Sequence, residues 1–151
     1  MFTTEWKFGM MEFDEIRAIR NAVFTEEFSL PEEQVFDWED GIAAHLLVRL
    51  ADGTAIGTAR IYPDGADTRI GPFAVRKEYR RQGYGDVSLR LLLYKAQQLP
   101  GARVLADVPE EFVRYYEWFG FSAAGEKQNG VLPMSIDREK IHFPSECGHN
   151  H

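Results

Sequence analysis

Two arginines stand directly before a pair of closely spaced glycines in the stretch YRRQGYGD, residues 79–86. Leucines at helical spacing follow, so the glycines lie where a helix begins. Backbone N–H groups at a helix N-terminus have no partner within the helix, and the helix dipole attracts anions there. Gly83 and Gly85 lack the side chains that would keep a phosphate from the backbone, and Arg80 and Arg81 add forked donors that suit phosphate oxygens. The stretch therefore predicts a pyrophosphate site.

Two well-known phosphate loops do not fit this stretch. A P-loop needs Gly-Lys-Ser/Thr at its end, whereas Gly85 is followed by Asp86 and Val87. The dinucleotide fingerprint G-x-G-x-x-G fits except for its last glycine, where Ser88 stands. However, a hairpin signal precedes the loop and too little chain follows it to complete a parallel sheet. The context therefore argues against a dinucleotide fold.

A third pattern, Arg/Gln-x-x-Gly-x-Gly/Ala between a strand and a long helix, fits residues 80–85. A second segment, RYYEWFGF at residues 114–121, follows about thirty residues later. With these two motifs in this order the chain resembles the GNAT superfamily of acyl-CoA N-acyltransferases. More narrowly, it resembles a bacterial subgroup of small, stand-alone acetyltransferases. The resemblance covers most of the chain and is strongest from Ile70 to Phe121.

The resemblance implies an N-acetyltransferase that moves an acetyl group from acetyl-CoA to a primary amine of a small molecule or peptide. The amine would attack directly in a ternary complex. By resemblance, the strand before the loop pairs with the pantetheine arm through its backbone, and the loop amides and arginines hold the pyrophosphate. The implied cofactor-binding residues are Phe73, Ala74, Val75, Arg80, Arg81, Gln82, Gly83, Tyr84 and Gly85.

The resemblance also offers a proton donor for the departing thiolate. Tyr116, which precedes Glu117 in YYEWFGF, matches the family tyrosine that lies beside the sulfur. Tyr115 is the alternative, since it points about 100° round the same helix. Without the glycine loop, the aromatic stripe that includes both tyrosines would be interpreted as a core-facing helix surface.

The general base is not identified by the sequence. Many members of the family place a glutamate on the strand before the loop, but residues 69–73 contain no carboxylate. Candidates elsewhere are His45, Glu39 and Glu111, or a water chain. The acidic stretch at residues 37–40 is interpreted as a solvated loop that could attract a cationic amine.

One further acidic residue stands close to the loop. Asp86 begins the helix, where a carboxylate is favoured for the same reason as a phosphate and could compete with it, unless its side chain points outward.

The elements that must position these residues follow from periodicity and turn signals. We expect an α/β (α+β) fold: a mixed, mostly antiparallel central sheet flanked by helices, with a splayed parallel pair at the acyl-CoA site. Asp52-Gly53 predicts a hairpin turn. Four helices are expected: 14–28, a short segment after Pro31, the segment from the glycine loop to Leu99, and 112–119. Asp14 is the expected N-cap of the first. The expected strands span 3–8, 44–50, 55–62, 68–75, 102–108, 121–126 and 131–136.

Composition bounds the remaining possibilities. A chain of 151 residues suits a single domain, 1–151, with a disordered tail at 143–151. A net charge of −7 disfavours nucleic-acid binding. We expect a cytoplasmic protein without a membrane partner, because no apolar run would span a bilayer and MFTTEWKF does not resemble a signal peptide. The lone Cys147 excludes an internal disulfide, and no metal site is expected from it with His149 and His151.

Two other functions remain open at this level. The missing glutamate would suit a non-catalytic acyl-CoA-binding or regulatory domain. A nucleotide-binding interaction module would instead be stabilised by NAD or ATP. The aromatic-rich terminal strands are compatible with a homodimer.

Overall fold

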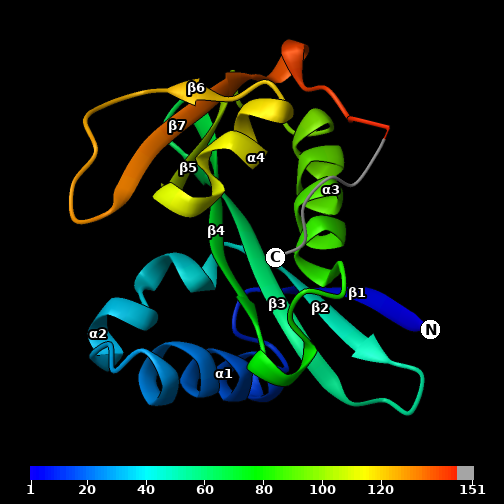
Figure 1. Cartoon of the computed structure of the whole chain (residues 1–151). Coiled ribbons are helices and arrows are strands. Elements are labelled where there is room, and N and C mark those ends of the chain that lie inside the picture. The colour runs from blue at the N-terminus through cyan, green and yellow to red at the C-terminus, as the bar shows by residue number, and fades with distance from the viewer. Residues whose placement is uncertain (146–151) are drawn as a thin grey trace.

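A seven-stranded mixed sheet forms the centre of the computed structural model, which describes residues 1–145 (Figure 1). The strand order is β1-β2-β3-β4-β5-β7-β6. Neighbouring strands are antiparallel except β4 and β5, which run parallel, so the predicted sheet type is confirmed. The strands are β1 (Phe2–Phe8), β2 (Ala44–Leu50), β3 (Ala55–Asp64), β4 (Asp67–Val75), β5 (Arg103–Pro109), β6 (Ser122–Ala123) and β7 (Val131–Asp137).

Helices connect these strands and flank the sheet. The first, α1 (Asp14–Arg20), continues without a break as a π-helix, η1 (Asn21–Glu27), so the predicted helix forms but changes type halfway. The other α-helices are α2 (Glu32–Val35), α3 (Tyr84–Gln97) and α4 (Val113–Trp118). Short 3₁₀ turns are η2 (Trp38–Gly41), η3 (Lys77–Tyr79), η4 (Glu110–Phe112) and η5 (Arg138–Lys140).

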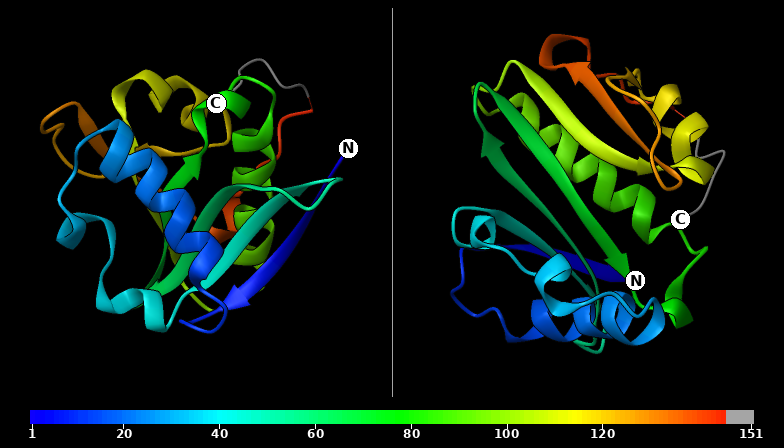
Figure 2. Two further views of the ribbon diagram at one scale, coloured as in Figure 1. Left: turned by 90° about the horizontal axis from the view of Figure 1, so that it is seen from below. Right: turned by 90° about the vertical axis from the view of Figure 1, so that its left-hand side faces the viewer.

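Alternating residues of β2 divide the apolar core between the two faces of the sheet. Leu46 and Val48 belong to the cluster that contains the leucines of α3, whereas Leu47 belongs to the cluster with Ile16 and Ile19 of α1. This is the period of two that a strand imposes on its side chains. The helices α1 and α3 therefore cover opposite faces, as the views in Figure 2 also show.

The parallel pair separates after three residues. Thr68–Ile70 of β4 pair with Val104–Ala106 of β5. Beyond Ile70, β4 no longer pairs with β5, although it continues to pair with β3. Gly71 and Pro72 come next, and proline has no N–H for a ladder hydrogen bond. Beyond that point β5 keeps its other neighbour, β7, as far as Pro109. One edge of residues 71–75 therefore has no neighbouring strand within residues 1–145, in agreement with the expected splayed parallel pair.

Two details differ from the sequence-based expectation. Phe13, not Asp14, is the N-cap of α1, and it makes no side-chain cap hydrogen bond. Asp14 lies in the first turn, where its negative charge interacts favourably with the helix dipole. The strand predicted at 121–126 contains only Ser122 and Ala123. Its next partner position on β7 is Pro133, which cannot donate to the ladder.

The described chain reaches into the tail that we predicted from residue 143. Phe143 packs against the main core, and the backbone oxygen of Pro144 accepts a hydrogen bond from Arg90 at 2.8 Å. Cys147, His149 and His151 lie outside the described residues. Within residues 1–145, no helix combines the length and apolar character that crossing a bilayer requires.

Candidate functional site

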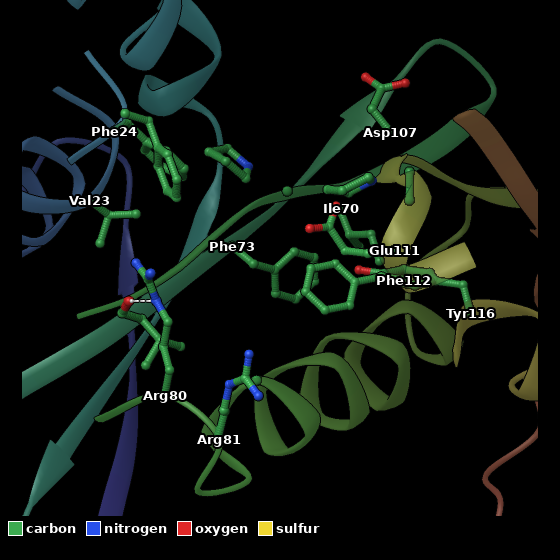
Figure 3. A pocket seen from close by; sticks show the side chains of 17 residues that line it. Val23, Phe24, Ile70, Phe73, Arg80, Arg81, Asp107, Glu111, Phe112 and Tyr116 are labelled. Carbon is green, nitrogen blue, oxygen red and sulfur yellow. Dashed lines mark hydrogen bonds between the residues drawn. The ribbon is translucent and has the colours of Figure 1, made fainter. Parts of the chain in front are cut away.

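A cleft of about 820 Å³ opens where β4 and β5 separate (Figure 3). Its vertex is formed by Ile70 and Ala106, the last pair of the parallel ladder. From there, Gly71, Pro72, Phe73 and Val75 line it along the unpaired edge of β4. The cleft thus exists because two strands that begin side by side diverge.

Two helical segments supply the other walls. The π-helix η1 and the residue that ends it contribute Val23, Phe24 and Phe28. The segment from η4 into α4 contributes Phe112 and Tyr116. Val23, Phe24 and Phe28 lie in the helix predicted at 14–28, but the sequence did not show that they would form this wall. A π-helix often marks a functional site, but its hydrogen-bond pattern cannot be recognised from residue types.

The glycine loop lies at one end of the cleft. Gly83 is the N-cap of α3, with φ of 90°, a left-handed conformation that glycine adopts at little cost. No side chain caps this helix, so its first-turn amides receive no acceptor of that kind. Gly85 and Arg81 line the cleft, and Arg81 makes no hydrogen bond or ion pair with any residue of 1–145. The loop is therefore arranged to receive an anion.

Arg80, the other arginine of the loop, is already bound. Its Nε donates to the backbone oxygen of Val75 at 2.9 Å, and its two terminal nitrogens lie 2.5 and 2.6 Å from the carboxylate oxygens of Glu27. This hydrogen bonding lowers the pKa of Glu27. The ion pair joins the loop to the end of η1, across the mouth of the cleft.

Four of the predicted cofactor-binding residues do not line the cleft. The side chain of Ala74 is buried on the α1 face of the sheet. Tyr84 turns towards β1, where its ring lies 5.6 Å from that of Phe2 in an edge-to-face contact. Gln82 is exposed and donates to the backbone oxygen of Glu78 at 3.5 Å. For Ala74 and Gly83, only backbone groups remain available to the predicted role.

The two adjacent tyrosines of α4 have different surroundings. Tyr116 lines the cleft, and burial raises the pKa of its hydroxyl. Tyr115 does not line it; its hydroxyl donates to Asp86, and burial together with this hydrogen bond raises its pKa. Of the two rings, only that of Tyr116 faces the space where β4 and β5 part.

Asp86 does not compete for an anion in the cleft. Its carboxylate is buried and accepts hydrogen bonds from Tyr115 and from Nε of Arg90, the latter at 2.8 Å. It therefore neither occupies the phosphate end nor points into solvent, the two alternatives that the sequence left open.

The expectation of a solvated acidic loop at residues 37–40 is wrong for Asp40, whereas Asp37 is exposed as expected. Asp40 is 1% exposed and receives hydrogen bonds from Arg20 at 2.8 Å and Arg60 at 2.9 Å. Arg60 also binds Asp37 and donates to the backbone oxygen of Gly71 at 2.7 Å. A network of opposite charges therefore ties α1 and η2 to the point where β4 begins to splay.

His45 belongs to this network and not to the cleft. Its Nε2 lies 3.0 Å from the backbone oxygen of Asp40, and its Nδ1 lies 3.5 Å from a guanidinium nitrogen of Arg20, so Nδ1 accepts and Nε2 donates. Burial lowers its pKa. Neither His45 nor Glu39 lines the cleft, whereas Glu111, the third candidate base, does.

The charges of the cleft are separated along its length. Figure 3 shows Arg80 and Arg81 at one end and Asp107 at the other, with Glu111 in the region between them. Asp107 pairs with Arg69 at 3.3 Å. Glu111 makes no hydrogen bond or ion pair with any described residue. No group of three or more potential metal ligands occurs among residues 1–145.

Comparison with known proteins agrees with this geometry. The family model described as "Acetyltransferase (GNAT) family" matches residues 13–121. An acyl-CoA N-acyltransferase from Pseudomonas aeruginosa has a TM-score of 0.79 at 22% identity, covering 89% of this chain and 99% of that one. ElaA from Escherichia coli has a TM-score of 0.78 at 21% identity, covering 91% and 100%.

A structure with a bound ligand is also similar. The PaiA N-acetyltransferase from Thermoplasma acidophilum, solved in complex with coenzyme A, has a TM-score of 0.64 at 14% identity, covering 89% of this chain and 99% of that one. At these identities the solved structures establish the shared fold. The comparison with curated protein sequences finds no match.

Proposed function

Because this chain belongs to the GNAT acetyltransferase family, we propose that it transfers an acetyl group from acetyl-CoA to a primary amine. The amine attacks the thioester directly in a ternary complex, without a covalent enzyme intermediate. The observation that carries the proposal is the cleft itself: an unpaired strand edge, a glycine-capped helix N-terminus and a buried tyrosine line one continuous space.

Each part of the cleft suits one part of acetyl-CoA. The open edge of residues 71–75 offers backbone groups to the amides of the pantetheine arm, as an added strand would use them. The amides of the first turn of α3, with Arg81, suit the pyrophosphate. Arg80 keeps two N–H groups that are not used by Glu27 or Val75, and these can also reach a phosphate. The coenzyme A bound to PaiA supports the choice of donor.

Tyr116 is proposed as the donor to the departing sulfur. Its raised pKa keeps the hydroxyl protonated until negative charge develops on the thiolate. A positioned general acid contributes roughly 10²–10⁴-fold to rate. Holding amine and thioester together contributes further, since effective molarities of about 10⁵ M or more occur in well-oriented reactions.

Two measurements test this function. Thermal stability should rise with coenzyme A, saturably, and not with NAD or ATP. Thiol should be released from acetyl-CoA when a broad panel of amines is present. Saturable binding without thiol release for any amine would favour the non-catalytic acyl-CoA-binding domain. Stabilisation by NAD or ATP alone would favour the nucleotide-binding module.

A further inference from the structure

The part of the cleft beyond the glycine loop, between η1 and the η4–α4 segment, is proposed to hold the acceptor amine and is called the acceptor half here. It is apolar on both sides. Figure 3 shows Val23 and Phe24 on one side and Phe73 and Phe112 on the other. Phe28, 56% exposed, continues the first side towards the glycine loop, where its ring lies 5.7 Å from the guanidinium carbon of Arg80. Side chains of this type bury aromatic and aliphatic surface of a ligand and offer no hydrogen-bond partner to its polar groups. A ligand that fills this half must itself be largely apolar.

Of the charged side chains in this half, one has no polar partner among residues 1–145. Asp107 is paired with Arg69. Glu111 lines the cleft and has no polar partner among residues 1–145. It stands in η4, five residues before Tyr116 along the same wall. Glu111 is exposed and stands beside Phe112 on an apolar wall, and one carboxylate in such a place suits one ammonium group on an apolar body.

We propose that the acceptor is a small monoamine with an aromatic or branched aliphatic body and no carboxylate beside the amine, and that Glu111 binds its ammonium group. This rests on the proposed function. The volume of about 820 Å³ falls within the range of about 300–1,000 Å³ usual for small-molecule sites, which must here hold the acyl donor as well. A polyamine would bring a second cation against apolar walls, and an amino acid would bring its carboxylate close to Glu111.

Glu111 also accepts a proton in the proposed reaction. The ammonium loses one proton to Glu111 and then to solvent; the nitrogen lone pair attacks the thioester carbon, so that a C–N bond forms and the C–S bond breaks. The second proton leaves the nitrogen as the amide forms and restores the one that Tyr116 gives to sulfur. The products are the acetamide, coenzyme A as its thiol, and one proton released to solvent.

The experiment measures thiol release from acetyl-CoA by the full chain with four matched amines. Phenethylamine and isoamylamine represent the proposed class, phenylalanine adds a carboxylate to the first, and spermidine represents polyamines. We expect kcat/KM for phenethylamine to exceed that for phenylalanine and for spermidine by about tenfold or more. Equal or higher kcat/KM for either competitor overturns the inference.

A pair of adjacent glutamates provides the matched control. Glu111→Gln should lower kcat/KM for phenethylamine by about tenfold to a hundredfold and leave coenzyme A binding unchanged. Glu110→Gln should do neither, because Glu110 lies outside the cleft and pairs with Lys127 at 2.8 Å. Equal effects of the two variants, or none from Glu111→Gln, also contradict the inference.

The outcome separates this inference from the proposed function. Thiol release with spermidine or a peptide amine, but not with phenethylamine, leaves an acetyltransferase whose acceptor class is different. Absence of coenzyme A binding, or of thiol release with every amine, removes the function and the inference together.

Discussion

Both carboxylate oxygens of Glu27 contact the guanidinium of Arg80, at 2.5 and 2.6 Å, although 53 residues separate the two in the chain. The pair joins the last residue of η1 to the loop that begins α3. One wall of the acceptor half and the proposed phosphate end are therefore linked by a single ion pair. Any anion that binds Arg80 must share it with Glu27.

The first prediction concerns this link. Glu27→Gln removes a negative charge from the phosphate end and frees Arg80, so coenzyme A should bind about twofold to fivefold more tightly at low salt, as expected for a partly exposed pair. Isothermal titration gives the Kd. Glu26→Gln, one residue earlier and exposed, should leave it unchanged. A Kd for coenzyme A that rises in Glu27→Gln would mean that the ion pair helps to form the site.

The second prediction separates the two tyrosines of α4. Tyr116→Phe should lower kcat by about a hundredfold or more, with the Kd for coenzyme A nearly unchanged, because the hydroxyl acts on the developing thiolate. Tyr115→Phe removes the hydrogen bond to Asp86 and should lower stability by about 1–3 kcal/mol while kcat changes little. The reverse assignment of the kinetic effect would identify Tyr115 as the donor.

The third prediction uses the unusual backbone of Arg81. Its φ is 63°, in the left-handed region that favours glycine. Arg81→Ala and Arg81→Gly should both weaken coenzyme A binding, by about tenfold, since each removes the same unpaired cation. Of the two variants, the glycine variant should be the more stable, by up to about 1 kcal/mol. Unchanged binding in both would exclude the side chain from the phosphate site.

The fourth prediction concerns the buried network that supports the splay. Asp40→Asn should destabilise the protein by about 3 kcal/mol or more, because Arg20 and Arg60 would lose the charge that compensates them in the interior. Asp137→Asn, which breaks an exposed pair with Lys140, should cost about 0.5 kcal/mol or less. Urea unfolding measures both. Similar costs would show that the buried pairing contributes little to stability.

The fifth prediction is a pH dependence of stability that arises from His45. Its pKa is lowered in the folded protein, so below about pH 6.5 the unfolded chain takes up a proton that the folded one does not. The free energy of unfolding should therefore decrease as the pH falls through this range, with a slope of up to about 1.4 kcal/mol per pH unit from this residue.

His45→Gln should flatten this dependence below about pH 6.5, even if the variant is less stable throughout. His142→Gln, at an exposed position, should keep it. An identical slope in wild type and His45→Gln would contradict the assignment.

Much of the fold could be read from local patterns. Alternation in residues 44–50 and the Asp52-Gly53 turn predicted the β2–β3 hairpin, because strand period and turn chemistry depend on neighbouring residues. For the same reason, the glycines at 83 and 85 correctly predicted a loop at the start of α3, which we propose as the phosphate site. The splayed parallel pair was also expected, and Pro72, which has no N–H to donate, lies where β4 parts from β5.

Other features depended on partners distant in the chain. The expectation that Asp40 lies in solvent was wrong because Arg20 and Arg60, on other elements, bind it in the interior. Asp37 also pairs with Arg60 but remains exposed. The choice of Tyr116 over Tyr115 as the residue in the cleft depends on which side of α4 faces the gap between β4 and β5. The wall formed by Phe24 and Phe28 depends on the π-helix.

The sequence by itself thus determined most of the elements, their order and the position of the glycine loop, because backbone preferences and side-chain periodicity act over a few residues. Only the tertiary structure decided which charges are compensated and which remain for a ligand. That outcome depends on distances between elements. Glu27 forms an ion pair with Arg80, whereas Arg81 and Glu111 have no polar partner among residues 1–145. Ion pairs form between residues that are close in the folded structure, and their positions along the chain do not show which residues these are.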